Sequence, residues 1–270
     1  MKIARKSALL ALLPLLPLIA ALQCGGAHAA GGLLLIDAPP AQDDRLALGP
    51  ALLSYPRAPG SGRMKTLWIP GVDFYSSLGG FASTDIGAGW NFSRRDDLQW
   101  GPRLWPVTGR SDAASRQRGL DDIGTRLGKG LFLNYAPLEF LILQSSLLAG
   151  SGRHGDGVQA EAGVTVGAPI GEAALLGLSL GATWANGAHL RSYYGVTPQA
   201  AAAGGLPVYT PGAGWLDVNL ALNSEFRFNA RWKLSGQLMA ARLRGDAARS
   251  PVTSTREQNS ASLTLWYQFK

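Results

Sequence analysis

The sequence predicts an all-β protein, a closed antiparallel transmembrane β-barrel of about 12 strands (10–14). Three features lead to this expectation: strand-like alternation along the chain, a composition poor in charge and rich in glycine, and an export signal at the start. Charged residues make up 16% of the chain, against about 25% in soluble domains. A hydrophobic share of 46% is too high for a disordered protein. The single cysteine supports neither a disulfide scaffold nor a zinc module.

The first 29 residues have the three parts of a secretory signal peptide. Positive charges at Lys2, Arg5 and Lys6 precede an apolar segment, Ala8–Leu22, and the small-residue cleavage motif Ala27-His28-Ala29. We therefore expect residues 1–29 to be removed and residues 30–270 to form one outer-membrane barrel domain. The exported chain keeps 22 of the 25 basic residues against 18 acidic ones, and the excess is scattered, so nucleic-acid binding is not indicated.

Two other interpretations of the N-terminus fit less well. A membrane anchor needs about 20 apolar residues, and this run is shorter and interrupted by Pro14 and Pro17. A lipoprotein signal would lipidate Cys24, but the preceding residue, Gln23, is larger than that site accepts. Ordinary cleavage remains the prediction.

Residues 217–229 give the clearest strand signal. The even positions are apolar apart from one serine, and the odd positions are polar apart from one alanine. This period-two pattern over about thirteen residues predicts a strand longer than the ~5–6 residues usual in globular proteins. The same alternation recurs over residues 158–167, 176–185, 231–240 and 262–269.

Further apolar, strand-like runs precede these five, and together they give eleven strands. They are Arg45–Ser54, Met64–Tyr75, Gly80–Phe92, Leu98–Val107, Arg126–Tyr135 and Leu138–Leu148. Single-chain bacterial barrels have even strand numbers. One strand has therefore been missed, or one strand has been split into two, and Gly32–Ile36 is a candidate for the twelfth.

The two faces of these strands favour a membrane barrel over a soluble sandwich. The polar face carries Gly, Ser, Thr, Asn and Gln, which suit a lumen, and the apolar face would then contact lipid. Lipid cannot satisfy an open sheet edge, so the sheet must close. The aromatics expected to form interfacial girdles are Trp68, Tyr75, Trp90, Trp105, Trp215, Trp232 and Tyr267. The penultimate Phe269 resembles the C-terminal aromatic common in outer-membrane barrels.

Three segments resemble the MipA/OmpV family, the MltA-interacting proteins of Gram-negative outer membranes. They are Gly119–Ile123, Arg191–Thr197 and Arg242–Val252. The resemblance spans about residues 46–269, and the Gly-Asp-Ala-Ala element at 245–248 is its most specific part. One departure is Arg249, where the family usually has an acid. The candidate motif and interaction residues are Tyr193, Tyr194, Gly195, Val196, Gly245, Asp246, Ser250 and Pro251.

The resemblance implies a non-enzymatic scaffold in the outer membrane. Such a protein would contact outer-membrane lipid and bridge a lytic murein transglycosylase and a murein synthase in peptidoglycan turnover. Alternatives are a permeability or transport barrel, a surface adhesin and, less favoured, a lipid-modifying barrel enzyme. The resemblance implies no catalytic residues and no cofactor, and the sequence does not indicate an oligomeric state.

Two features resemble catalytic or metal chemistry, and a structural interpretation is preferred for both. Ser179 lies in a G-x-S-x-G match, but the alternation continues through it, so the strand–turn–helix elbow of a hydrolase is not expected. Ser151, His154 and Asp156 could form a local triad, but we expect a loop there. The two histidines of the exported chain, His154 and His189, do not have metal-ligand spacing.

The stretch from Gly195 to Gly214 is longer than an ordinary loop. Residues 199–203 could form one helical turn within it. The segment would then fold into the lumen as a plug, present a partner surface, or simply fill space. Tyr193 and Tyr194, just before it, could also be an interfacial aromatic pair.

Overall fold

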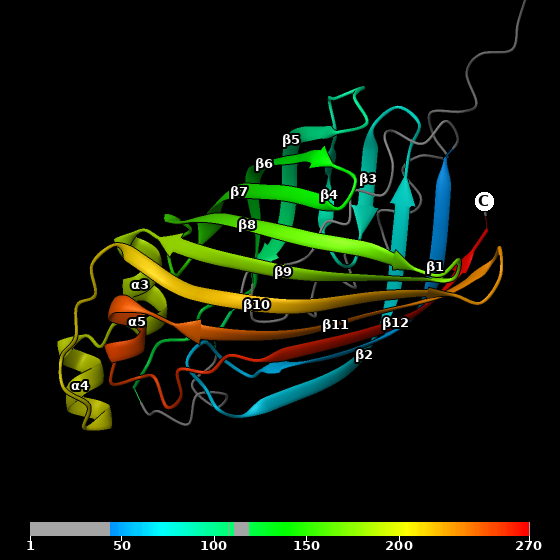
Figure 1. The fold of residues 1–270 in the computed structure, drawn as a ribbon. Coiled ribbons are helices and arrows are strands. Elements are labelled where there is room, and N and C mark those ends of the chain that lie inside the picture. Colours follow the sequence, from blue (N-terminus) through cyan, green and yellow to red (C-terminus); the bar gives the residue numbers. More distant parts are fainter. Residues whose placement is uncertain (1–43, 108, 111–118, 270) are drawn as a thin grey trace, which may run out of the picture.

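The protein is a closed barrel of twelve antiparallel strands, which confirms the predicted fold class (Figure 1). The computed structural model describes residues 44–107, 109–110 and 119–269. The strands are β1 (Arg45–Pro56), β2 (Met64–Tyr75), β3 (Gly80–Ser83), β4 (Gly87–Trp90), β5 (Leu98–Val107), β6 (Arg126–Leu138), β7 (Leu141–Ser151), β8 (Gly157–Ile170), β9 (Ala174–Ala185), β10 (Gly214–Arg227), β11 (Trp232–Leu243) and β12 (Ser260–Gln268). The helices are α3 (Gly187–Tyr194), α4 (Pro198–Gly204) and α5 (Gly245–Arg249).

Each strand pairs with its neighbours in sequence, and β1 closes the ring against β12 with Ala47 opposite Gln268. The first and last strands therefore start and finish at the same end, which we call the near end. The near-end connections are short: residues 76–79, 91–97, 139–140, 171–173 and 228–231. The connections toward the far end are residues 57–63, 84–86, 108–125, 152–156, 186–213 and 244–259. Short periplasmic turns and long extracellular loops are typical of such barrels, so the near end corresponds to the periplasmic side.

The helices belong to the far-end connections, two in residues 186–213 and one in residues 244–259. None of the helices among the described residues is both long and apolar enough to cross a membrane.

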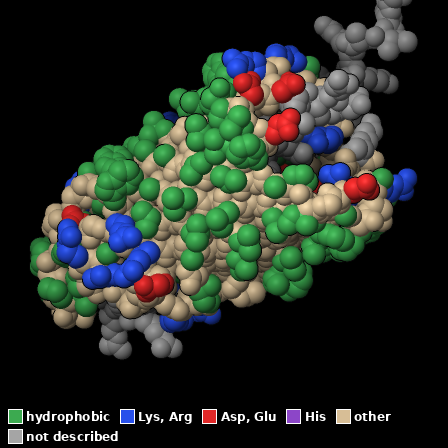
Figure 2. All heavy atoms as spheres, in the orientation of Figure 1, with side chains coloured by type: hydrophobic (Ala, Val, Ile, Leu, Met, Phe, Trp, Pro, Cys, Tyr) green, Lys and Arg blue, Asp and Glu red, His purple; other side chains and the backbone are tan. Residues whose placement is uncertain are grey.

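The strand faces alternate as the sequence predicts. On β10, Asp217, Asn219 and Asn223 are buried inside the barrel, whereas Leu220 and Leu222 lie exposed on its outer surface. Comparable exposed leucines on β6, β7, β9 and β11 contribute to an apolar outer surface, and hydrophobic side chains are spread over the wall in Figure 2. The arrangement is the reverse of a soluble protein and suits a barrel that is surrounded by lipid.

The expected single strand Gly80–Phe92 is wrong: it is a hairpin of two four-residue strands, β3 and β4. The turn between them ends at Gly87, which adopts φ +82°, a conformation that favours glycine. This hairpin supplies the twelfth strand. The alternative twelfth strand, Gly32–Ile36, and the predicted signal peptide both lie outside the described residues.

Four of the residues predicted for the aromatic girdle are exposed on the outer surface, the face that a girdle requires: Trp68, Trp90, Trp215 and Trp232. Tyr267 packs edge-to-face against Trp232, with ring centroids 5.0 Å apart.

Two of the predicted girdle residues are wrongly placed. Tyr75 and Trp105 face inward and pack on a lumen cluster that contains Phe81, Ile86 and Phe132. Each lies two residues from an inward-facing charged side chain, Asp73 on β2 and Arg103 on β5. In a strand, residues two apart share a face, so these aromatics line the lumen.

Candidate functional site

The three segments that resemble a known family lie together at the far end of the barrel. Residues 193–196 end α3 and continue from it, residues 245–251 contain α5, and residues 119–123 approach both. We call α3, α4, α5, their connections and residues 119–123 the cap. Figure 1 shows the helices gathered at the end of the barrel opposite the C-terminus.

Local sequence signals define both ends of α3. The Asn186 side chain accepts a hydrogen bond from the His189 amide at 2.9 Å, which is an N-cap, and also one from Val158 on β8 at 3.0 Å. The helix stops at Gly195, whose amide donates to the Arg191 carbonyl. A Cβ at position 195 would collide with that carbonyl oxygen, so the tight exit requires glycine.

The cap has its own apolar core. Leu190, Tyr193 and Tyr194 of α3 are buried against the inward-facing ends of three strands, through Ala185, Leu216 and Leu243, and against Ile123 and Ala247. A second buried cluster joins Leu120, Val196, Ala200 and Val252. The interpretation of Tyr193 and Tyr194 as an interfacial aromatic pair is therefore wrong, because both rings belong to a packed interior across the far mouth of the barrel.

Buried hydrogen bonds connect the parts of this core. The Ser250 hydroxyl, at the end of α5, donates to the Tyr194 carbonyl at 2.6 Å. The Arg110 guanidinium donates to the Tyr193 carbonyl at 2.7 Å and to the Asp121 carbonyl at 3.3 Å. Arg110 could not be predicted as a site residue, because nothing in the adjacent sequence distinguishes it from a solvated loop arginine.

Asp246 joins α5 to the long connection that precedes β10. Its carboxylate accepts from the Gly212 amide at 2.8 Å and from Arg249 at 2.6 Å, and these bonds lower its pKa. The Tyr209 hydroxyl donates to the Asp246 carbonyl. Arg249, the departure from the family pattern, therefore pairs with the neighbouring acid.

The remaining predicted site residues are structural parts of the same assembly. Gly245 begins α5 with φ +48°, and the half-buried Pro251 follows Ser250. The helical turn expected at residues 199–203 is confirmed as α4, which starts after the Thr197 N-cap and stops at Gly205 with φ +73°. All eight predicted motif residues thus come from two distant segments that meet in the cap.

The local triad considered for Ser151, His154 and Asp156 is not formed, since His154 and Asp156 are exposed. Ser151 instead contacts His189 of α3, with its Oγ 2.9 Å from Nδ1. Both side chains are buried, and burial lowers the pKa of His189 to about 3, so the ring is neutral. This pair fastens the β7–β8 turn to the cap, and neither side chain is open to a substrate.

Side chains that face the lumen bond to one another along the wall, between neighbouring or next-but-one strands. Arg103, Ser146 and Glu161 form one chain, with Ser146 Oγ 3.2 Å from the guanidinium and 2.8 Å from the carboxylate. Ser179 contacts Thr165 at 2.9 Å and Asn223 at 3.0 Å, which confirms that it faces the lumen and is not a nucleophile elbow.

A cavity of about 50 Å³ lies beside the Arg103–Glu161 chain, lined also by Asn134 and Asn219. Within the described part of the chain, no group of three or more His, Cys, Asp or Glu side chains is arranged to bind a metal. The geometry is that of a barrel capped at its far end.

Comparison with known proteins adds a family match. The family model described as MltA-interacting protein MipA matches residues 48–269. A search of curated protein sequences gave no match.

Several solved structures resemble the barrel at low identity. The translocator domain of the autotransporter NalP from Neisseria meningitidis has 15% identity and a TM-score of 0.42, with 97% of this chain and 96% of that chain covered. The NanC porin has 9% identity and a TM-score of 0.39, covering 83% and 98%. OmpT of Vibrio cholerae has 8% identity and a TM-score of 0.36, covering 84% and 97%.

Proposed function

Because the chain belongs to the MltA-interacting protein MipA family, we propose that it is a non-enzymatic scaffold of the outer membrane that holds murein enzymes together. The partners are a lytic murein transglycosylase and a murein synthase. The barrel is the anchor, and its surface toward the periplasm is where these enzymes bind.

The observation that carries this proposal is the packed cap. The buried cap core spans the far mouth of the barrel, and buried hydrogen bonds join its segments. A barrel that conducts solutes needs a continuous water-filled path. A barrel whose far mouth is closed by a packed core supports anchoring better than transport.

The orientation of the barrel indicates which surface the enzymes contact. Murein and the enzymes that act on it lie on the periplasmic side, and the near end has the short turns typical of that side. The near-end connection at residues 91–97 is the longest of these turns and carries Arg94, Arg95, Asp96 and Asp97, with Arg95 paired to Asp97 at 2.6 Å. We assign partner contact to this end, and we assign closure of the barrel to the motif residues of the cap.

Site-specific crosslinking tests the assignment. A photoreactive amino acid is placed at position 94 of the full-length protein in detergent. It should crosslink to a purified lytic transglycosylase added to the sample. The matched control places it at Ala202, an exposed position on α4 at the far end. Two results would overturn the proposal. One is capture from position 202 alone. The other is capture from neither position, together with no binding of the transglycosylase to the immobilised barrel.

Planar-bilayer recording separates the scaffold from the permeability alternative. The scaffold predicts no steady conductance from pure, heat-modifiable barrel. The result that favours a channel is a set of steady, salt-dependent conductance steps. These steps would disappear, or change their ion selectivity, in an Arg103→Ala or Glu161→Ala variant.

A further inference from the structure

An arginine cluster lies at the far rim of the barrel, immediately beyond the apolar outer surface. It comprises Arg242 and Arg244 around the end of β11, Arg249 at the end of α5, and Arg256 before β12. Figure 2 shows Lys and Arg side chains gathered with few acids at the far end, beside the hydrophobic wall. The two carboxylates within the cluster are Asp246 and Glu257.

The direction of two of these arginines follows from the strand. Along β11 the outward-facing positions include the exposed Trp232, Leu238 and Ala240, and position 242 continues this row. Position 244 is still extended, with φ −126° and ψ 175°, so it continues the same face. The lipid-facing row of β11 thus ends in Arg242 and Arg244.

A tryptophan marks the interfacial level at this point. Trp215 starts the neighbouring strand β10 and is 59% exposed on the outer surface. The Arg244 amide bonds to the carbonyl of the next residue, Leu216, at 2.8 Å. Tryptophan is enriched at the level of lipid headgroups. The arginines therefore lie where headgroup charges are found.

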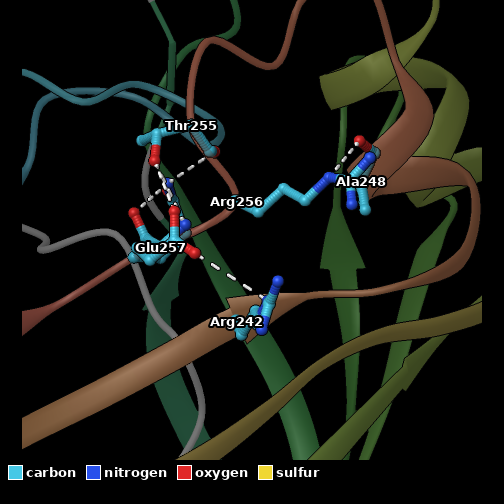
Figure 3. A network of polar contacts seen from close by, with 6 residues as sticks. Arg242, Ala248, Thr255, Arg256 and Glu257 are labelled. Carbon is cyan, nitrogen blue, oxygen red and sulfur yellow. Dashed lines mark hydrogen bonds and ion pairs between the residues drawn. The ribbon is translucent and has the colours of Figure 1, made fainter.

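The cluster has four arginines and two carboxylates, so it keeps an excess of positive charge. Glu257 Oε1 lies 3.8 Å from Arg242 Nε and Arg249 pairs with Asp246, whereas in the described structure no ion pair to a carboxylate involves Arg244 or Arg256. Arg256 Nε instead donates to the Ala248 carbonyl at 3.2 Å, which holds the guanidinium in place (Figure 3). Figure 3 shows Glu257 between Thr255 and Arg242, whereas the Arg256 side chain extends away from it toward Ala248.

We propose that this cluster binds the phosphate groups of outer-leaflet lipid, the phosphorylated glycolipid of Gram-negative outer membranes. Guanidinium groups bind phosphate oxygens in a bidentate manner. Arginine stems can lie along apolar surface while the charged groups reach the headgroups. The proposal depends on the far end facing outward and is independent of the scaffold role.

Native mass spectrometry of the full-length barrel in detergent tests this site. The probes are diphosphoryl lipid A and the same lipid without phosphates. We expect the wild-type protein to retain diphosphoryl lipid A, and the double variant Arg244→Gln/Arg256→Gln to bind it about 25-fold more weakly. That factor corresponds to about 1 kcal/mol per arginine near an anionic surface, at 1.4 kcal/mol per tenfold change.

The matched control removes two exposed arginines at the near end, as Arg94→Gln/Arg231→Gln, and should leave binding unchanged. The conservative Arg244→Lys/Arg256→Lys variant should recover much of the affinity. Heat-modifiable mobility in SDS shows that each variant has folded.

Three results would overturn the proposal. One is equal retention of phosphorylated and dephosphorylated lipid by the wild-type protein. Another is unchanged binding in the folded double glutamine variant. The third is displacement of the lipid by millimolar inorganic phosphate alone, which would identify a site for free anions.

Discussion

Replacing Leu190 by alanine should loosen the cap without affecting the barrel wall. Leu190 is 0% exposed, in the middle of the cap core between α3 and the inward ends of the strands. The change removes three carbon atoms, about 0.8 kcal/mol each on transfer, and leaves a cavity, so the usual cost is about 2–5 kcal/mol. Taking about 3 kcal/mol, the population with an open cap rises roughly 100-fold at 1.4 kcal/mol per tenfold change.

Hydrogen exchange measured by mass spectrometry reads this population directly, because amides exchange when the segment that protects them opens. Peptides from residues 187–205 of Leu190→Ala should exchange roughly 100-fold faster than in the wild-type protein. Peptides from residues 217–227 of β10 should keep their protection.

Leu238→Ala is the matched control, since Leu238 is 60% exposed on the outer surface of β11 and makes no part of the cap core. It should leave exchange in residues 187–205 unchanged. Unchanged exchange in Leu190→Ala, or an equal increase in both variants, would refute the conclusion that the cap is a packed unit.

Three further predictions concern single contacts. Acid should open the cap, because the pKa of His189 is about 3 in the folded protein and returns to about 6.5 when the ring is exposed. The stabilisation of the cap is complete above pH 6.5 and falls by up to about 1.4 kcal/mol per pH unit below it. Hydrogen exchange in the cap, compared at pH 7 and pH 5, should show this loss of stability in the wild-type protein and not in His189→Gln. Ser250→Ala leaves the buried Tyr194 carbonyl without its donor, at a cost of about 1–3 kcal/mol, and proteolysis within the cap should become about tenfold or more faster; an unchanged rate would contradict a tie between α5 and α3. Gly87→Ala places a Cβ against a β5 carbonyl at φ +82°, so the heat-modifiable form should be largely lost, whereas Gly171→Ala, at φ +65° in open space, should fold; equal yields would disprove the tight approach.

Most of the barrel wall could be predicted from the sequence, because the alternation of polar and apolar residues along a strand shows which residues share a face. The parity of Asp217 and Leu220 already separates lumen from lipid on β10. The same parity places Tyr75 and Trp105 inside, on the face of Asp73 and Arg103. Nearness to a strand end alone does not show which face an aromatic occupies.

The β3–β4 hairpin was harder to predict because it is so short. Residues 84–86 form the turn, and the signals within Gly80–Phe92 are Ser83-Thr84-Asp85 followed by Gly87. Four-residue strands give too few alternations to be recognised separately, so the run resembles one strand with small residues inside it.

The cap could not be derived from local patterns, since its contacts join distant segments. Ser250 bonds to Tyr194 across 56 positions of sequence, and the amide of Gly60 bonds to Gln258 across 198. Family resemblance identified the segments but not their partners. Arg110 and the Ser151–His189 pair carried no signal, because burial alone gives them their roles.

The short β3–β4 hairpin has a consequence for the surrounding bilayer. Four residues span about 13 Å at 3.3 Å per residue, roughly half of the ~25 Å apolar band of such barrels. The neighbouring strand β2 is paired to β3 only at Asp73–Tyr75, and in the described structure its residues from Met64 to Pro70 have no strand on that side. Pro70 lacks an amide hydrogen, as suits a strand edge. The apolar face that lipid contacts is therefore shorter beside this hairpin than elsewhere on the wall. The bilayer has to thin on that side of the protein to match it. A tilt of the whole barrel toward that side would relieve the mismatch.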